Sequence, residues 1–425
     1  MRRYLVDKKE DIRGLDVRER LVEFPLHKNF ITSVVGPRRA GKTYSLYGLI
    51  LNKKSLRDED YLFLNFEDYP VSSLEIGEVA EAVSLHQELY GREPEFIFLD
   101  EVQGLKKWET LVYTLYEKKR YFLFITGSSS KLLSREIATQ LRGRAVSTLV
   151  LPLSFREFLM SRGELPKEPL STRAESSVRG LLRAYLTDGG FPDIVFTSVN
   201  RKAFFRDYLD LVVFKDVVER FGIKEPHVVR LLIAHLLSSF SGEFSVNRVF
   251  NSLKSGGIKV SKKTLYGYAD ALEEAMFCFF LPKFSPSLRK SFLSVPKVYL
   301  NDPGLINHLM TTKLDEEIGK LMENTVFLEL KRRGETELFY WRDHQGREVD
   351  FAIREGASTK KLIQVTYASS RDEVERRELD GILKAGRAMG CKELEVITWD
   401  YEESVELEGK RVRFVPLWRW LCSPS

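Results

Sequence analysis

Apolar residues in the first third of the chain form continuous runs that are separated by helical patterns. Residues 44–50 have helix-compatible spacing, whereas the continuous runs are typical of buried parallel strands. These runs lie at residues 30–35, 61–67, 95–101, 120–126 and 146–151. The alternation predicts an α/β fold, a parallel sheet with covering helices, over residues 1–152.

The middle of the chain, residues 153–312, has mainly helical periodicity. After a connector at 153–170, helical patterns occur at residues 179–186, 201–220 and 227–240. Two capped helices joined by a turn then follow at 245–254 and 261–275, and two strand-like segments at 277–284 and 297–300. Two helices followed by two strands predict a winged-helix unit within a helical domain.

The last block, residues 313–425, again mixes both patterns. An amphipathic helix at 318–330 precedes strand-like segments at 337–341, 347–353 and 361–367. This order predicts a separate α/β domain.

Residues 36–43, Gly-Pro-Arg-Arg-Ala-Gly-Lys-Thr, fit the phosphate-binding loop pattern G-x-x-x-x-G-K-[ST] at every fixed position. The loop lies between a strand-like run and a helical segment, which is the context that the motif requires. Its N–H groups and the helix N-terminus favour phosphate, Lys42 is expected to reach the β- and γ-phosphates, and Thr43 to hold Mg²⁺. The residues expected to bind ATP are Gly36, Pro37, Arg38, Arg39, Ala40, Gly41, Lys42, Thr43 and Tyr44.

The apolar run at 95–101 ends in two carboxylates, Asp100 and Glu101. Ligands of open α/β sheets bind at the carboxyl ends of the strands. We therefore expect Asp100 to order Mg²⁺ and Glu101 to act as the general base that polarises the attacking water.

Further polar residues follow the next strand. Thr126, Ser128 and Ser129 are candidates for sensing the γ-phosphate, and a serine-rich turn that caps a helix is the alternative. Arg142 and Arg144 are candidates for stabilising charge in the transition state, in their own chain or in a neighbouring subunit. A plain pair of surface arginines is the alternative for these two.

The helix-turn-helix pattern carries basic residues where a DNA-binding unit would need them. Lys262 and Lys263 lie in the first turn of the second helix, and Arg289 and Lys290 lie between the two strands. We expect these four side chains to contact phosphates of double-stranded DNA. A lid or docking role without DNA contact is the alternative.

The last block carries Glu323 on its helix, Asp350 in its hairpin and Gln364 on the next strand. This is the layout of a PD-(D/E)XK nuclease, in which such groups hold Mg²⁺ that activates water. The last acid is replaced by Gln364 and the usual lysine by Thr366, so an active nuclease would need a lysine from elsewhere, and the sequence identifies none. A nuclease-like fold kept for binding or docking is the alternative.

Composition adds broad limits. A chain of 425 residues with 43% hydrophobic and 30% charged residues is typical of a folded protein of two or three domains. The formal charge of +5 permits nucleic-acid binding without arguing for it. The three cysteines are widely spaced, no apolar stretch is long enough to span a membrane, and the N-terminus lacks a signal-peptide core. We expect a cytoplasmic protein with no membrane partner.

The motifs together resemble the prokaryotic, especially archaeal, AAA-type P-loop ATPases with a winged-helix middle region and a C-terminal PD-(D/E)XK nuclease-like domain. The resemblance implies ATP binding and hydrolysis with Mg²⁺, and leaves the substrate open. It extends over nearly the whole chain and rests on residues 36–43, 98–103 with Trp108, 126–130, 141–144, 151–159, 189–192, 296–299 with Asp302, and 348–351.

These patterns predict an ATP-driven, DNA-associated switch or motor that binds ATP and ADP. One alternative is an ATP-gated nuclease. Another is a signalling or scaffold ATPase that binds a protein partner and no nucleic acid. Oligomerisation stays open, because an arginine acting on a neighbouring subunit would require it.

Overall fold

The computed structural model describes residues 1–127, 143–167, 170–310 and 314–423. It forms two compact units, residues 1–151 with 274–276 and residues 152–273 with 277–425. The sequence-based boundary after residue 152 lies at the junction of the two units. The boundary proposed between residues 312 and 313 lies inside the second unit.

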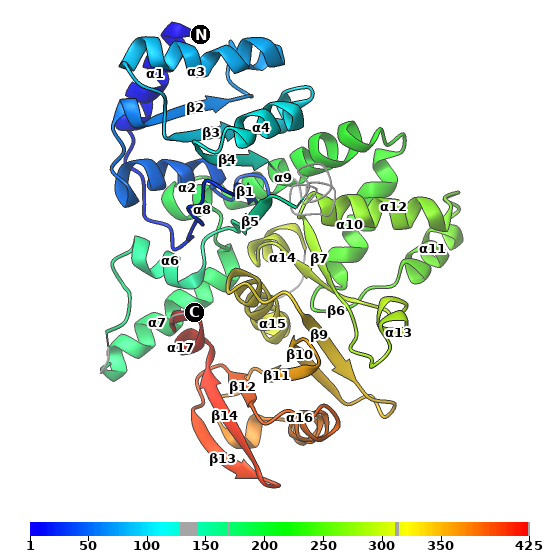
Figure 1. Ribbon diagram of the computed structural model, residues 1–425. Coiled ribbons are helices and arrows are strands. Elements are labelled where there is room, and N and C mark those ends of the chain that lie inside the picture. The colour runs from blue at the N-terminus through cyan, green and yellow to red at the C-terminus, as the bar shows by residue number, and fades with distance from the viewer. Residues whose placement is uncertain (128–142, 168–169, 311–313, 424–425) are drawn as a thin grey trace. The chain divides into compact units, whose positions relative to one another are not determined.

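The first unit is built on a five-stranded sheet in the order β2-β3-β4-β1-β5, in which every pair is parallel (Figure 1). The strands are β1 (Ile31–Val35), β2 (Tyr61–Asn65), β3 (Phe96–Asp100), β4 (Phe122–Gly127) and β5 (Ala145–Leu149). Their apolar runs are buried because helices cover a parallel sheet on both faces. The predicted P-loop type of α/β sheet is confirmed, and β4 lies between β1 and β3, so the carboxyl ends of these three strands are neighbours.

The helices of the first unit follow the predicted alternation with strands. They are α1 (Arg2–Arg13), α2 (Lys42–Gly48), which continues as a π-helical turn at Leu49–Lys53, α3 (Ile76–Tyr90) and α4 (Trp108–Glu117). Stacked rings tie the strands together: the centroid of Phe98 lies 6.0 Å from that of Phe63 and 4.9 Å from that of Phe124. Aromatic pairs of this kind stabilise a core beyond the apolar area that they bury.

The second unit begins with helices and a small sheet. The helices are α6 (Phe155–Ser161), α7 (Thr172–Asp188), α8 (Pro192–Phe196), α9 (Arg201–Leu211) with a π-helical continuation at Val212–Glu219, α10 (Pro226–Ser238), α11 (Val246–Ser255), α12 (Lys262–Glu274), α13 (Leu288–Phe292) and α14 (Gly304–Leu309). The strands β6 (Gly242–Glu243), β7 (Cys278–Leu281) and β8 (Lys297–Leu300) pair antiparallel in the order β6-β8-β7. Both helices and both strands predicted for residues 245–300 are therefore present.

The second unit ends in an α/β region with a six-stranded sheet, order β13-β14-β12-β11-β10-β9 (Figure 1). Its elements are α15 (Leu314–Arg332), β9 (Leu338–Arg342), β10 (Glu348–Glu355), β11 (Ser358–Val365), α16 (Arg376–Ala388), β12 (Leu394–Thr398), β13 (Glu403–Leu407), β14 (Lys410–Pro416) and α17 (Leu417–Cys422). Among the helices of the described ranges, none has the length and apolar character of a membrane-spanning segment. The three cysteines are free.

Three distant segments meet at Leu153 in the second unit. The Leu153 N–H donates to the Gly190 carbonyl at 2.7 Å, and the Leu153 carbonyl accepts from the Tyr185 hydroxyl at 2.7 Å. The Gly190 N–H donates in turn to the Asp302 carboxylate at 2.7 Å. The segment 151–159, the Gly-Gly pair and Asp302, which are separate motifs in the sequence, thus form one hydrogen-bonded junction.

We expect Gly190→Ala to destabilise this junction, because a Cβ at position 190 would lie 2.3 Å from the Leu153 carbonyl oxygen. Relieving that clash breaks the two backbone hydrogen bonds of Gly190, with an expected cost of about 2–3 kcal/mol. Thermal unfolding followed by circular dichroism should show a Tm lower by roughly 5–10 °C. Gly180→Ala in α7 is the matched control, because nothing lies within 4 Å of its Cβ. Equal Tm values for both variants would contradict a rigid junction.

Candidate active site

The loop at residues 36–43 connects β1 to α2 at the carboxyl edge of the sheet. Its first residue, Gly36, lies so close to the next segment that a Cβ would be 1.9 Å from the Val150 carbonyl oxygen. Glycine is therefore required there by packing. Helix α2 begins at Lys42 directly after the loop, so the strand–loop–helix context predicted for the motif is present.

Lys42 is buried at the centre of the loop. Its ammonium donates to the carbonyl oxygens of Gly36 and Pro37, both at 3.2 Å, and lies 3.8 Å from the Glu101 carboxylate. Only 5% of the Lys42 side chain is exposed. A cation anchored inside the loop is suited to neutralise a phosphate that the loop holds.

Asp100 joins the loop to the neighbouring strands. Its carboxylate accepts a hydrogen bond from the Thr43 hydroxyl at 2.8 Å and one from the Thr126 hydroxyl at 2.5 Å. The side chain is fully buried, and burial raises the pKa of Asp100 to about 6. The structure thus brings together three residues from α2, β3 and β4 that the sequence singled out separately.

Thr126 also positions the second carboxylate. Its hydroxyl accepts from the Glu101 N–H at 2.9 Å while it donates to Asp100. Glu101 has the left-handed backbone conformation, φ 52°, and its carboxylate also accepts from the Gln103 amide. Sequence reasoning gave Gln103 no role, although it lies within the motif at 98–103.

Arg20 is a second residue that sequence reasoning missed. Its guanidinium donates to the carbonyl oxygens of Ala40 and Leu151, both at 2.9 Å, and so braces the loop from the segment before β1. No motif surrounds Arg20, so only the fold reveals this contact.

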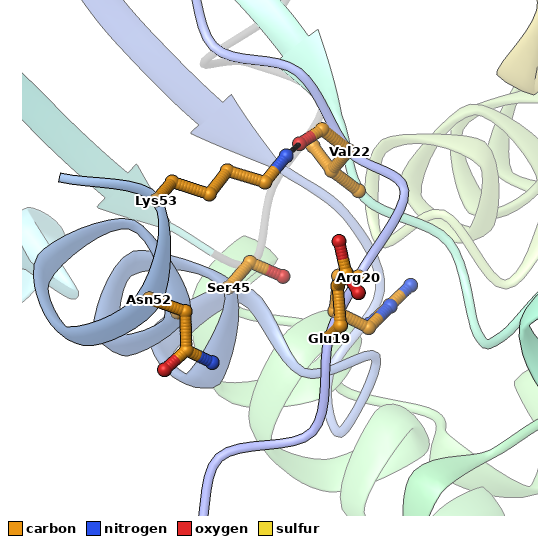
Figure 2. A pocket seen from close by; sticks show the side chains of 7 residues that line it. Glu19, Arg20, Val22, Ser45, Asn52 and Lys53 are labelled. Atoms are coloured by element: carbon orange, nitrogen blue, oxygen red, sulfur yellow. Dashed lines mark hydrogen bonds between the residues drawn. The ribbon is translucent and has the colours of Figure 1, made fainter. Parts of the chain in front are cut away.

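Figure 2 shows a hollow beside Arg20. Two of the residues that line it are joined by a hydrogen bond, which the Lys53 ammonium donates to the Val22 carbonyl at 2.7 Å.

The residues that line this hollow are Glu19, Arg20, Val22, Ser45, Gly48, Asn52 and Lys53. None of them belongs to the loop at 36–43, so the hollow is not the phosphate site.

Of the remaining residues predicted to act in catalysis, the structure describes only Arg144. Ser128, Ser129 and Arg142 lie outside the described residues. Arg144 is held against α4, because its guanidinium pairs with Glu117 at 2.6 Å and lies 5.2 Å from the centre of the Tyr113 ring. These contacts favour the surface role for Arg144 within its own chain, and an action on a neighbouring subunit stays a prediction.

Arg38 lies within the phosphate loop, and Tyr44 lies directly after it in the first turn of α2. Arg38 lies 3.7 Å from the Glu67 carboxylate, and the Tyr44 side chain is exposed beside Tyr47. Contact of these two residues with ATP stays a prediction.

Basic residues are segregated in the second unit around α11, α12 and α13. Residues 244–269 contain five lysines and arginines and residues 277–301 contain four, with no aspartate or glutamate in either segment. Seven of these cations are exposed, and we call them the basic set. They are Arg248, Lys254, Lys259, Lys262, Lys263, Arg289 and Lys290.

Within the described ranges, no ion pair joins any member of the basic set to a carboxylate. Lys262 and Lys263 start α12, whose N-terminus is capped by the Ser261 hydroxyl accepting from the Thr264 N–H at 3.0 Å. Arg289 and Lys290 lie in α13, next to Phe292 and Leu293, which are 81% and 75% exposed. All four predicted phosphate contacts are therefore at the surface.

The predicted nuclease-like residues meet a lysine that the sequence did not identify. The Lys297 ammonium, on β8, donates to Glu323 and to Asp350, both at 2.9 Å, and pairs with Glu348 at 2.5 Å. Burial alone would lower the pKa of Lys297, but the carboxylates of Asp350 and Glu323 hold it well above its ordinary value. A lysine from elsewhere is thus present, and it comes from a strand that precedes the domain in the sequence.

Gln364 lies on β11 beside this cluster. The register of β10 and β11, with Phe351 opposite Ile363, places Gln364 opposite Asp350 on the same face of the sheet. Gln364 is buried, and within the described residues its side-chain oxygen has no hydrogen-bond partner. In the same described part of the chain, no group of three or more His, Cys, Asp or Glu side chains is arranged to hold a metal ion.

Comparisons with known proteins agree with the geometry of the first unit. Residues 28–159 match the AAA domain family (AAA_14), while residues 179–317 and 318–420 match two domains of unknown function, DUF8612 and DUF4143. The chain is 33% identical to the uncharacterized protein MJ1544 of Methanocaldococcus jannaschii, over 98% of this chain and 93% of that protein. It is 29% identical to an uncharacterized protein of Haemophilus influenzae, over 94% of this chain and 96% of that protein.

Two solved structures of archaeal proteins also align along much of the chain. The Orc1 protein of Aeropyrum pernix, in complex with DNA, is 17% identical, with 72% of this chain and 91% of that chain covered and a TM-score of 0.29. Cdc6p of Pyrobaculum aerophilum is 14% identical, with 76% and 95% covered and a TM-score of 0.26.

Proposed function

We infer that this chain is a Mg²⁺-dependent ATPase associated with DNA. The chain belongs to the same family as MJ1544 of Methanocaldococcus jannaschii, and its residues 28–159 match the AAA domain family. The observation that supports the ATPase is the network in which Thr43 and Thr126 both donate to Asp100, beside Lys42 and Glu101. The network unites the phosphate loop with two acids at the edge of the sheet, where α/β folds bind ligands.

The side chains at this site fit ATP and Mg²⁺. Mg²⁺ prefers oxygen ligands and phosphate, and the Thr43 hydroxyl and the Asp100 carboxylate lie within 2.8 Å of each other. Bound Mg²⁺ would neutralise charge on the β- and γ-phosphates. The loop N–H groups and Lys42 hold the phosphates, and Glu101 orients the attacking water and accepts its proton.

Thr126 links the two acids of this site. Its single hydroxyl contacts the Asp100 carboxylate and the Glu101 N–H, so a change at one acid alters the hydrogen bonding of the other. We propose that Thr126 senses whether the γ-phosphate is present. Ser128 and Ser129 are the other candidates for this role.

The basic set supports association with DNA. Seven exposed cations without carboxylate partners in the described residues create a local positive potential that a net charge of +5 does not indicate. Two of them start a helix that follows a turn, the arrangement in which a helix presents its N-terminal residues to the major groove. We propose duplex DNA as the partner, with Lys262, Lys263, Arg289 and Lys290 as phosphate contacts.

Phe292 and Leu293 extend this proposal to apolar contacts. Two adjacent, strongly exposed apolar side chains lie next to Arg289 and Lys290. They suit a surface whose cations contact phosphates and whose apolar side chains contact sugars or bases.

We expect the double variant Phe292→Ser, Leu293→Ser to bind duplex DNA roughly tenfold more weakly, without a change in how affinity depends on salt. Fluorescence anisotropy at several salt concentrations measures both quantities. A lower salt dependence would show instead that the change disturbs the neighbouring cations.

The decisive experiment is steady-state ATP hydrolysis with Mg²⁺, with duplex DNA, with single-stranded DNA and with neither, and with Lys42→Ala as the blank. We expect duplex DNA to stimulate a rate that the Lys42 change abolishes. A rate indifferent to every nucleic acid would contradict the DNA association and leave the ATPase standing. The alternative of a protein-binding scaffold ATPase would then be favoured, especially if partner binding did not depend on salt.

The ATP-gated nuclease is the other alternative. It requires metal-dependent cleavage of DNA that Asp350→Ala removes. Lys297 supplies the lysine that the sequence lacks, but its ammonium lies between Glu323 and Asp350, where the metal ion would have to bind, and this position argues against the nuclease.

A further inference from the structure

Three carboxylates from two elements converge on one ammonium in the second unit. Glu323 belongs to α15, and Glu348 and Asp350 belong to β10, while Lys297 belongs to β8. An ammonium has three donor hydrogens, and the three carboxylates lie 2.5–2.9 Å from it. The contacts with Glu323 and Asp350 are hydrogen bonds, and the contact with Glu348 is an ion pair.

The same carboxylates are satisfied by further donors. The Tyr299 hydroxyl donates to Glu323 at 2.6 Å, and the Val365 N–H donates to Asp350 at 2.9 Å. The side chains of Lys297, Asp350 and Glu323 are 4%, 6% and 11% exposed. A phosphodiester cannot reach acids that are covered to this extent unless the surrounding elements move.

A divalent cation cannot take the position between Glu323 and Asp350 that the Lys297 ammonium occupies. Two positive centres within a few ångströms in a buried environment repel strongly, because little water is present to screen them. The nuclease-like layout would need its metal between Glu323 and Asp350, which is where the ammonium lies. The residues present therefore do not fit a resident metal ion.

We propose that Lys297 is a built-in cation that takes the place of a divalent metal ion, so that the C-terminal α/β region binds no metal and does not cleave nucleic acid. The buried Gln364 oxygen has no partner in the described residues and lies on the same side of the sheet as Asp350, so it adds a free oxygen beside the carboxylates. Removing the lysine converts this set of oxygens into a divalent-cation site.

The cluster also gives the C-terminal region a role that needs no catalysis. Lys297 ties β8 to α15 and β10, and other bonds run alongside it within the second unit. The Asn324 amide contacts both the N–H of Leu300 at 2.8 Å and its carbonyl at 3.1 Å, and the Tyr340 hydroxyl donates to the Val295 carbonyl at 2.6 Å. These contacts hold β8, the strand that follows Arg289 and Lys290, against α15 and the six-stranded sheet.

The test is Mn²⁺ binding to the full-length, nucleotide-free protein, followed by electron paramagnetic resonance. A Thr43→Ala background removes the hydroxyl that we assign to the metal at the phosphate loop. We expect no Mn²⁺ bound in this background at micromolar concentration. Adding Lys297→Ala should create one site, and adding Asp350→Asn to that variant should remove the site again.

Two outcomes overturn the proposal. The first is Mn²⁺ binding with Lys297 intact that Asp350→Asn abolishes, because metal and ammonium would then coexist. The second is a folded Lys297→Ala protein that gains no Mn²⁺ site. Should Lys297→Ala fail to fold, nicking of supercoiled DNA by the unmodified protein still decides, measured with Mn²⁺ or Mg²⁺ both with and without ATP because the alternative is an ATP-gated nuclease. Nicking that Asp350→Asn removes would refute the proposal, and equal nicking by the two proteins under all these conditions, at background level, would support it. The Mn²⁺-binding outcomes do not depend on the ATPase, because they are measured without ATP.

Discussion

Replacing Glu101 with glutamine is expected to leave ATP binding intact and to slow hydrolysis by about 10²- to 10⁴-fold, the range that a positioned general base contributes. Glutamine is nearly isosteric and keeps an oxygen that accepts from the Gln103 amide. The Glu101 N–H that bonds to Thr126 belongs to the backbone and is unaffected. The variant therefore loses proton acceptance from water and the negative charge 3.8 Å from the Lys42 ammonium, but keeps these hydrogen bonds.

Two measurements separate binding from hydrolysis in this variant. Binding of a fluorescent ATP analogue should give a Kd close to that of the original protein, while single-turnover hydrolysis should fall. Lys42→Ala should differ by weakening binding as well, because the loop loses its internal cation. Glu81→Gln on the exposed face of α3 is the matched control and should change neither quantity. Hydrolysis at the original rate in Glu101→Gln would place the base on another residue.

Neutralising Lys262, Lys263, Arg289 and Lys290 together, each by glutamine, is expected to lower duplex affinity by two to three orders of magnitude at about 0.1 M salt. Each phosphate contact contributes about 0.9 to the slope of log affinity against log salt, so the slope should fall by roughly four. Glutamine keeps most of the length of each side chain, and all four residues are exposed, so the fold should be unaffected.

A control variant with the same change in net charge distinguishes binding of DNA by a local surface from attraction of DNA by the overall charge of the protein. Lys202, Lys392, Arg376 and Arg413 are exposed and lie outside the segments of the basic set. Changing these four to glutamine should leave the affinity within about threefold of the original and the slope unchanged. Equal losses in both variants would mean that DNA is attracted by overall charge, which would contradict a specific surface at α12 and α13.

The phosphate loop could be identified without a structure because its chemistry is local. Eight consecutive residues supply the turn, the cation and the hydroxyl, and the apolar run before them identifies the strand. The same reasoning found Asp100 and Glu101, because acids that follow a buried strand lie at the ligand-binding edge of a parallel sheet. The helix pair at 245–275 was also predictable, since capping serines and helical spacing are encoded locally.

Contacts that depend on side chains from distant elements could not be predicted in this way. Arg144 is a candidate for stabilising charge in the transition state, and no sequence pattern shows that Glu117 and Tyr113 on α4 contact it within its own chain. Arg20 belongs to no pattern, and only packing shows that it braces Ala40 and Leu151. In both cases the partner is set by the fold and not by neighbours in the sequence.

The sequence by itself determined the α/β class, the phosphate loop, the two acids beside it and the helix pair, because each depends on short-range periodicity or on contiguous residues. Only the tertiary structure decided what the C-terminal carboxylates bind. Lys297 precedes Glu323 and Asp350 by 26 and 53 positions, and a pattern search for a lysine after the acids looks in the wrong direction. The role of a buried charge is set by the opposite charges that the fold places around it, and this depends on how distant elements pack in space.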